Sequence, residues 1–318
     1  MSGGRPLPSR PQVFSGGVDV ALLHYVSQPR QVLPGQFYML TRRCAQRMFL
    51  LRPDDATNNA FIYCLALAAI KFGVEVLFTL AESNHHHTVI FDRYGHVSAF
   101  LEHFHKLVAR SQNALRGRWE NFWASHEPCI TRLLDRDAVI DKLVYAASNP
   151  VKDRLVERVH HWPGVNTYAA FIHGHSITAT RPRHFFRASM PESVTLDLVI
   201  PPELGDAAEV IREVREGVEA IEERVRLERM QSGARVFGRR RVLAQSWKDC
   251  PTSFEPRRER RPRFAGAVAV RVPALASYRS FLWAYRYARD RWRRGLEAVF
   301  PPGTYWLTRF ANVQVAPT

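Results

Sequence analysis

One stretch of the chain decides how its first half folds: Val74-Glu75-Val76-Leu77-Phe78-Thr79-Leu80-Ala81-Glu82-Ser83-Asn84-His85-His86-His87-Thr88-Val89-Ile90-Phe91. Residues 74–80 are a continuous apolar run of strand length, and Ser83 and Asn84 are turn residues. Residues 85–91 return as a second β-prone run that ends at Asp92. The stretch therefore predicts a β-hairpin with a His-x-His pair at the start of its second strand.

Strand and helix signals alternate on both sides of this hairpin. Residues 36–41 form an apolar, β-prone run. A helix follows, for which Thr57 is the expected N-cap, and Gly73 ends it. After the hairpin, Ser98 is the expected N-cap of a second helix, which Gly117 ends.

A fourth strand and a third helix complete the pattern. Residues 126–133 predict the strand. Asp135 is the expected N-cap of the helix, which should end at Ser148 because the residue before Pro150 leaves the helical region. The order β-α-β-β-α-β-α indicates an α+β fold with a ferredoxin-like, split βαβ arrangement, in which an antiparallel sheet of four strands carries helices on one face.

The second half of the chain is patterned mainly as helix. Residues 166–200 alternate apolar and polar side chains and are expected to add strands. Residues 203–230 predict a long amphipathic helix whose apolar seam suits packing against a helix of this chain or of a second copy in a homodimer. Residues 235–263 predict a flexible basic linker able to lie along phosphates, and residues 276–299 a helix that interleaves aromatic and arginine side chains.

The net charge of +15, from 45 Lys and Arg against 30 Asp and Glu, favours a polyanionic partner. Nucleic acid is the commonest such partner, and an anionic membrane, a heparin-like surface or a merely basic soluble protein are the alternatives. No run approaches the roughly 20 apolar residues that cross a bilayer, and the N-terminus lacks the apolar region of a secretory signal. The four cysteines lack zinc or disulfide spacing, which favours a reducing, cytoplasmic compartment.

Two histidines separated by one residue occur three times, at His85/His87, His103/His105 and His173/His175. Residues i and i+2 share one face of a strand but point about 200° apart around a helix. The second pair lies in a helical pattern, so its histidines are expected to be solvated or packed rather than to chelate a metal ion. The third pair lies in an expected strand but is split by Gly174. The first pair, in the hairpin, is the best candidate for a metal-binding pair. The alternative is that both histidines are simply exposed on the strand, which is the more frequent case for an isolated pair of this kind.

Support for a metal site comes from the third predicted helix. Tyr145 lies on the side opposite the apolar face formed by Leu143 and Ala146, and Asn149 shares its face because it is four residues further on. A tyrosine at the rim of the core is the plainer alternative. As a nucleophile, tyrosine conserves the energy of a cleaved phosphodiester in a phosphoester bond, while a divalent ion polarises the phosphate. Histidine combined with an oxygen ligand suits Mg²⁺ or Mn²⁺.

Three segments, within about residues 29–170, resemble a known family, the single-tyrosine transposases. Ser83-Asn84-His85-His86-His87-Thr88-Val89-Ile90 resembles their HUH motif, and Leu143-Val144-Tyr145-Ala146-Ala147-Ser148-Asn149-Pro150-Val151-Lys152 resembles their Tyr-x-x-x-Asn-Pro-Val-Lys/Arg signature. Gly117-Arg118-Trp119-Glu120-Asn121-Phe122-Trp123 is similar to the aromatic segment of the family before the fourth strand. The REP-associated tyrosine transposases are the branch that the chain resembles most.

The resemblance implies that His85, His87 and Asn149 bind Mg²⁺ or Mn²⁺ and that Tyr145 is the nucleophile. It also implies a substrate of single-stranded DNA with an adjacent hairpin, a 5′-phosphotyrosine product and a free 3′-hydroxyl. Two positions depart from the family pattern. Ser83 replaces the usual proline, which the loop is expected to tolerate, and His86 replaces a hydrophobic residue, so its side chain is expected to lie less deeply in the core than is typical.

The sequence thus predicts a DNA transposase or single-strand endonuclease. The alternative is a domesticated DNA-binding protein that recognises hairpins and has lost the chemistry; a phosphatase-like metalloenzyme would leave the basic linker unexplained. Further DNA contacts are expected from Lys142, Lys152, Arg118, Trp119, Arg239, Arg240 and Arg241. The predicted segments are a flexible tail (1–28), the catalytic domain (29–165), an accessory region with the long helix (166–234), the basic linker (235–265) and an Arg/aromatic C-terminal segment (266–318).

Overall fold

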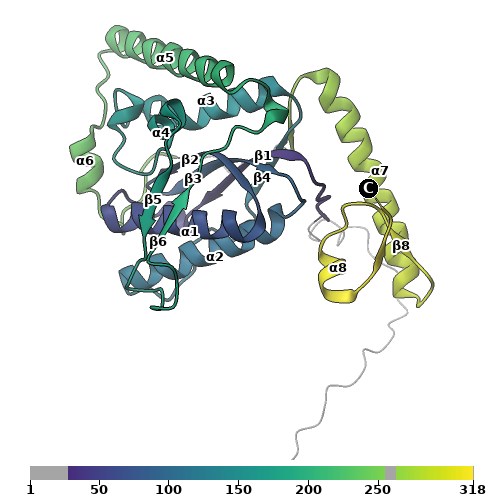
Figure 1. The fold of residues 1–318 in the computed structure, drawn as a ribbon. Coiled ribbons are helices and arrows are strands. Elements are labelled where there is room, and N and C mark those ends of the chain that lie inside the picture. Colours follow the sequence, from purple (N-terminus) through teal and green to yellow (C-terminus); the bar gives the residue numbers. More distant parts are fainter. Residues whose placement is uncertain (1–27, 255–262, 318) are drawn as a thin grey trace, which may run out of the picture.

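A mixed β-sheet separates two layers of helices in the computed structural model, which describes residues 28–254 and 263–317 (Figure 1). Across the sheet the strands run β2 (Glu75–Glu82), β3 (His85–Asp92), β1 (Gln36–Arg43), β4 (Cys129–Leu133) and β7 (Phe264–Ala265). The first four pair antiparallel, whereas β7 is parallel to β4. The α+β class is therefore confirmed, but the sheet is mixed rather than purely antiparallel.

The hairpin quoted above forms the heart of the sheet. Its two strands pair from Glu75 opposite Phe91 to Glu82 opposite His85, with a register shift between Val76 and Phe78, and Ser83 and Asn84 make the turn. β3 also pairs along its whole length with β1, so that Thr41 lies opposite His87. Because β3 separates β1 from β2, and β1 separates β3 from β4, each helical crossover passes over one antiparallel strand.

Helices α1 (Asp55–Phe72) and α2 (Val97–Arg116) cover one face of the sheet, and both begin differently from the prediction. The N-cap of α1 is Asp54, whose carboxylate accepts the backbone N–H of Thr57 at 2.7 Å, so Thr57 is the capped residue. α2 starts one residue before Ser98, where the Asp92 carboxylate accepts the backbone N–H groups of His96 and Val97 at 2.8 Å each. Ser98 makes no cap.

The opposite face of the sheet carries α3 (Arg136–Lys152) (Figure 1). The prediction that the helices lie on one face of the sheet is therefore wrong for α3. Asp135 is its N-cap, as predicted, and accepts the backbone N–H of Ala138 at 2.8 Å. The helix does not end at Ser148 but continues through Pro150. Pro150 removes one i→i−4 hydrogen bond near the end of the helix, and the burial of Val151 in the core keeps this last turn in place.

Helix α5 (Ala207–Ser232) packs along α3 and buries the predicted apolar seam within this chain. Val210, Val214 and Val218 are fully or almost fully buried. The region that precedes α5 contains the short helix α4 (Tyr168–His173) and the hairpin β5 (Ile177–Thr180) and β6 (Ser193–Leu196), which packs against α1. The expectation of strands is therefore correct for part of residues 166–200.

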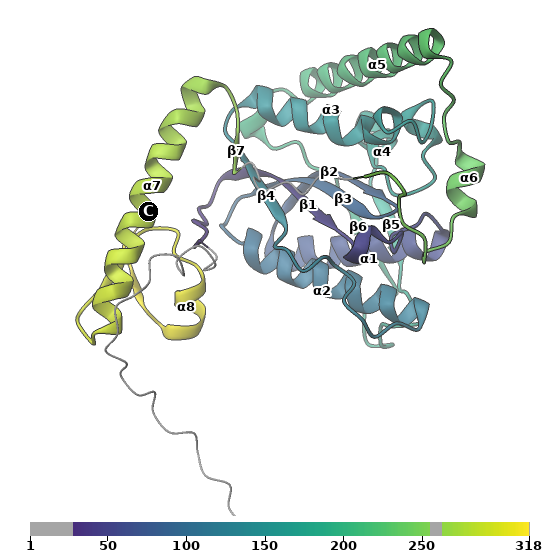
Figure 2. The same cartoon turned by 180° about the vertical axis from the view of Figure 1, so that it is seen from behind.

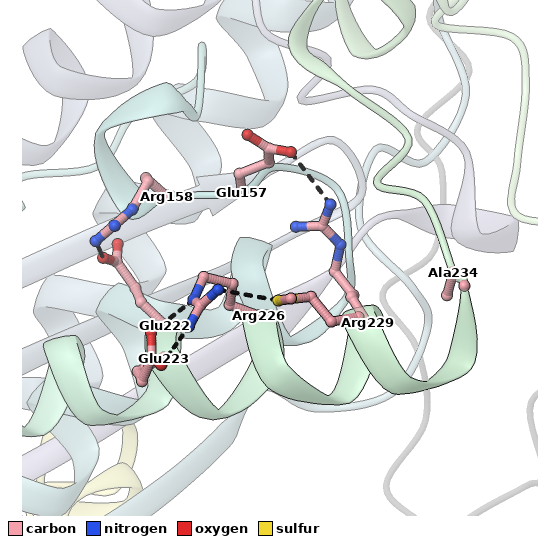
Figure 3. Close-up of a pocket in the computed structure, with 9 residues that line it drawn as sticks. Glu157, Arg158, Glu222, Glu223, Arg226, Arg229 and Ala234 are labelled. Atoms are coloured by element: carbon pink, nitrogen blue, oxygen red, sulfur yellow. Dashed lines mark hydrogen bonds and ion pairs between the residues drawn. The ribbon is translucent and has the colours of Figure 1, made fainter.

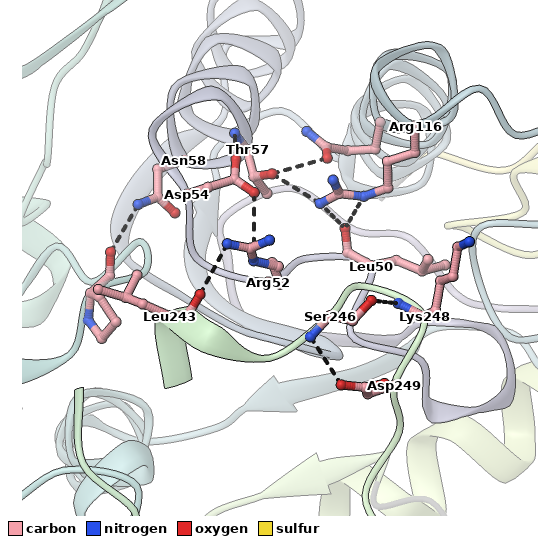
Figure 4. Close-up of polar contacts among 12 residues, drawn as sticks. Leu50, Arg52, Asp54, Thr57, Asn58, Arg116, Leu243, Ser246, Lys248 and Asp249 are labelled. Carbon is pink, nitrogen blue, oxygen red and sulfur yellow. Dashed lines mark hydrogen bonds and ion pairs between the residues drawn. The ribbon is translucent and has the colours of Figure 1, made fainter. Parts of the chain in front are cut away.

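Residues 235–254, the described part of the predicted basic linker, are hydrogen-bonded to the body (Figure 4). They contain helix α6 (Arg239–Ala244). Arg52 donates to the Leu243 carbonyl at 3.0 Å, and the Phe49 N–H donates to the Asp249 carbonyl at 2.9 Å. Of the remaining basic linker, Arg257, Arg258, Arg260 and Arg261 lie outside the described residues, as do residues 1–27 of the predicted tail.

The C-terminal part joins the sheet through β7 and then leaves it as a long helix, α7 (Val268–Arg293), longer at its start and shorter at its end than predicted (Figure 2). The second oxygen of the Asp135 carboxylate accepts the backbone N–H of Ala267 at 2.7 Å, so one side chain fixes the starts of both α3 and α7. Six short elements remain in the described ranges: η2 (Ala45–Arg47), η3 (Val159–His161), η4 (Pro202–Leu204), α8 (Trp306–Ala311) and the parallel pair β8 (Val299–Phe300) and β9 (Gln314–Val315). No helix in the described ranges is long and apolar enough to span a membrane.

Candidate metal and nucleophile site

His85 and His87 lie on β3, where the alternation of the strand directs both towards the face covered by α3. Their Nε2 atoms are 3.1 Å apart, and their rings are nearly perpendicular. His87 is buried, whereas the side chain of His85 is about one-fifth exposed. Burial is the largest cause that lowers the pKa of His87 well below its usual value, and the neighbouring His85 adds to it. The imidazole of His87 is therefore neutral, which is the form that binds metal ions.

The outer nitrogens of both rings are held by polar partners. The Nδ1 atom of His85 is 2.7 Å from the side-chain oxygen of Asn84, and that of His87 is 2.8 Å from the Thr41 hydroxyl. An amide oxygen only accepts, so Nδ1 of His85 carries a hydrogen and donates to Asn84. Partners of this kind fix the tautomer and the ring orientation of histidine ligands.

Tyr145 projects from α3 towards the histidine pair. Its ring centroid is 5.4 Å from that of His87, and 39% of the residue is exposed. The ammonium group of Lys152 lies 3.7 Å from the Tyr145 ring centroid, and that of Lys142 lies 5.5 Å from it. The structure therefore brings together the predicted nucleophile, one predicted metal ligand and two of the predicted DNA-contacting lysines.

Asn149 also reaches the pair, one helical turn after Tyr145. It is buried, and its side-chain nitrogen is 3.4 Å from Nε2 of His85. As placed, the nitrogen rather than the oxygen of the amide faces the histidine. A half-turn of the amide exchanges the two atoms within nearly the same volume, so the residue is in reach but must turn to act as an oxygen ligand.

Glu82 is a member of this cluster that sequence reasoning missed. It is almost fully buried, and one carboxylate oxygen lies 3.7 Å from Nε2 of His85. Burial raises the pKa of Glu82 to about 8, and the nearby Asp153 adds to this effect. The sequence contained one indication of this position, because the two-residue turn predicted for the hairpin places Glu82 directly opposite His85. No group of three His, Cys, Asp or Glu side chains in the described residues could hold a metal ion as placed, so a site here depends on Asn149.

The remaining histidine candidates lie elsewhere. His86 points to the other face of the sheet and is fully buried, so the expectation of a shallower side chain is wrong. His105 is packed in the core, as predicted for the helical pair, with its Nε2 2.9 Å from Nε2 of His86. His173 ends α4, and with His175 it is exposed rather than placed on a strand.

The other predicted DNA contacts lie on separate surface elements. Trp119, in the segment after α2, is 96% exposed, and the guanidinium of Arg118 stacks 5.6 Å from the Trp247 ring centroid. The three arginines of α6 are exposed: Arg239, Arg240 and Arg241. None of the contacts that the structure describes joins these residues to the histidine pair.

A surface pocket of about 400 Å³ lies between α5 and the segment before η3 (Figure 3). Its arginines are paired within the pocket: Arg158 with Glu222, Arg226 with Glu223, and Arg229 with Glu157, at 2.9, 2.7 and 3.1 Å. Because the charges compensate each other, the pocket indicates no class of charged ligand. The His/Tyr cluster is thus the better candidate for chemistry.

The chain matches no protein-family profile, and no curated protein is similar to it in sequence. Among solved structures it is similar to a REP-associated tyrosine transposase bound to a REP hairpin. The identity is 14% and the TM-score 0.40, over 56% of this chain and 96% of that chain. A likeness at this level does not assign a function, so the functional argument depends on the cluster itself.

Proposed function

We propose that this chain is a metal-dependent HUH-type transposase or endonuclease that cleaves and rejoins single-stranded DNA beside a hairpin. One observation carries the proposal: β3 and α3 bring His85, His87, Tyr145 and Asn149 together around one point. The strand order β2-β3-β1-β4 is compatible with the split βαβ arrangement of a ferredoxin-like domain, which would suit this class.

Each residue has a role that its surroundings support. His85, His87 and Asn149 would hold Mg²⁺ or Mn²⁺, which supplies positive charge to the oxygens of the scissile phosphate. Tyr145 attacks the phosphorus through its phenolic oxygen, the bond to the 3′-oxygen breaks, and a 5′-phosphotyrosine forms. The phenol loses one proton, and the leaving 3′-oxygen gains one. Lys152, beside the ring, favours the negative charge that develops on the phenolic oxygen.

The test is the fate of the covalent adduct. A single strand with a hairpin and a label on its 3′ side, incubated with Mn²⁺, should give a protein-linked product that resists denaturation. Tyr145→Phe should abolish the product, because phenylalanine keeps the ring and removes the nucleophile. Tyr94→Phe, at another exposed tyrosine, is the control and should leave it unchanged. Adduct that persists in Tyr145→Phe excludes the assignment.

A catalytically reduced DNA-binding protein is the second candidate, and the orientation of Asn149 favours it. The amide nitrogen faces His85, and the two imidazoles are within hydrogen-bonding distance of each other. Such a protein would bind hairpin DNA without cleaving it in Mg²⁺, Mn²⁺, Ni²⁺ or Zn²⁺. Metal titration of the cleavage reaction therefore separates the two proposals.

A further inference from the structure

Helix α7 has two chemically different faces. Tyr278, Phe281 and Leu282 are buried on one face, against Phe264 of β7. The residues of the other face fall within an arc of about 100° around the helix, at about 100° per residue, so they share one helical surface. They are all exposed: Arg279, Trp283, Arg286, Tyr287 and Arg294, here called the α7 stripe.

The aromatic rings of the α7 stripe are flat and open to solvent. Trp283 is 71% exposed and Tyr287 57% exposed. Their ring centroids are 5.8 Å apart and the ring planes differ by 6°, so the two rings lie parallel. Adjacent aromatic faces exposed in this way offer platforms on which planar groups can stack.

The charge of the α7 stripe is positive. Asp290, the one acidic residue of α7, is paired with Arg294 at 2.8 Å. Within the described part of the chain, no carboxylate pairs with Arg279 or Arg286. A second copy of the chain that docked through the same face would oppose arginines to arginines, which is unfavourable. Planar aromatic rings between unneutralised guanidinium groups fit a polyanion with planar bases.

We propose that the α7 stripe binds single-stranded DNA, with bases stacked on Trp283 and Tyr287 and phosphates beside Arg279 and Arg286. The choice of DNA over RNA rests on the proposed function, whereas the binding itself does not depend on cleavage. At about 1.5 Å per residue, the stripe extends for about 20 Å, which is enough for a few nucleotides. Stacking and charge do not read base edges, so binding should tolerate many sequences.

The test measures binding of the full chain to a labelled 20-nucleotide oligo-dT by fluorescence anisotropy without divalent ions. The double variant Trp283→Ala/Tyr287→Ala should lose about 10-fold or more in affinity. Trp283→Phe/Tyr287→Phe should bind nearly as the wild type, whereas Trp283→Leu/Tyr287→Leu, which keeps apolar bulk without an aromatic face, should lose as much as the alanine variant. Arg279→Gln/Arg286→Gln should flatten the dependence of affinity on salt.

The matched control is Trp306→Ala/Phe310→Ala on α8. These rings are also exposed and stacked, at 5.6 Å, but their neighbouring Arg309 is paired with Glu102. This variant should bind oligo-dT as the wild type does. Circular dichroism should show the same helix content in every variant, because the substituted side chains are exposed.

Several outcomes would overturn the proposal. Wild-type affinity in the alanine or leucine variant excludes stacking, and equal losses on α7 and α8 exclude a specific surface. If the variants lose affinity for oligo-U as much as for oligo-dT, the ligand is single-stranded nucleic acid in general and not DNA in particular. If the variants differ from the wild type in molar mass by light scattering, the face is an interface between copies of the protein. Loss of the adduct in Tyr145→Phe does not test the stripe. Conversely, a wild-type chain that binds oligo-dT through the stripe but forms no adduct refutes only the proposed function.

Discussion

Gly217 of α5 lies against Val144 of α3, the helix that carries Tyr145. A Cβ atom placed on Gly217 would lie 2.7 Å from Cγ2 and 3.2 Å from Cγ1 of Val144. Real Cβ contacts are essentially never shorter than 3.0 Å. Valine is stiff about χ1, so its methyl groups cannot turn away at low cost.

Two opposed effects decide the stability of Gly217→Ala. Alanine is favoured over glycine inside a helix by about 1 kcal/mol. Overpacking of a well-filled interface costs about 1–3 kcal/mol. We therefore expect Gly217→Ala to lower the free energy of unfolding by up to about 2 kcal/mol, although helix propensity alone predicts an increase.

The double-mutant cycle with Val144→Ala isolates the contact. In that background both methyl groups are gone, so Gly217→Ala should become stabilising by about 1 kcal/mol. The coupling energy between the two sites, from urea unfolding followed by circular dichroism, should then be about 1–3 kcal/mol. Glu216→Ala, at an exposed neighbour on α5, should show no coupling. A coupling near zero, or a stabilising Gly217→Ala in the wild type, would refute the close approach of α5 to α3.

Three further predictions concern the cluster and its supports. Thr41→Val removes the hydroxyl 2.8 Å from Nδ1 of His87 and should weaken Mn²⁺ binding, measured by calorimetry, by about 10-fold or more. Burial lowers the pKa of Lys152 to about 8, so its ammonium is present below that pH and lost above it. Affinity for single-stranded DNA at constant ionic strength should therefore fall as the pH rises through about 8, and Lys152→Arg, which stays charged, should remove the fall. Asp135→Ala removes acceptors for the N–H groups of Ala138 and Ala267, and should lower the unfolding free energy by about 1–2 kcal/mol and increase amide exchange at the start of α7.

Local patterns predicted the order of elements up to α3 but not their ends. Thr57 and Ser98 were plausible caps, yet a carboxylate a few residues upstream takes each position, because a charged acceptor forms the stronger hydrogen bond to a helix N-terminus. Pro150 predicts an earlier end for α3, but the helix continues to Lys152, and Val151 in this last turn is buried in the core. In each case the deciding contact involves a residue outside the local pattern.

Contacts between distant segments could not be predicted from periodicity at all. The two residues of β7 align beside β4 across more than 130 residues of chain, and Arg132 opposite Phe264 has no signature in either segment. The apolar seam of α5 was visible, but its choice of α3 as partner depends on the absence of a side chain at Gly217. The place of Glu82 in the site could not be predicted from periodicity either. Its burial results from packing of helix α3 on the sheet and not from its neighbours along β2.

His86 shows how the two faces of β3 depend on each other. The alternation that directs His85 and His87 towards Tyr145 must direct His86 into the core beside Phe61 and Phe104. A buried imidazole without partners would be costly, but Nδ1 of His86 is 3.1 Å from the Thr88 hydroxyl and Nε2 is 2.9 Å from His105.

The helical histidine pair, which cannot chelate a metal ion, thus has a structural role through His105. Nδ1 of His105 is in turn 3.0 Å from a guanidinium nitrogen of Arg42 on β1. Burial lowers the pKa of His86 to about 3, so the imidazole at the centre of this network is neutral, and the charge of the network lies on the half-buried Arg42 at one end. The hydrogen bonds of His86 on the opposite face of the sheet hold β3 in place, and with it the backbone of His85 and His87. The candidate site needs this rigidity because its residues come from two separate elements, β3 and α3.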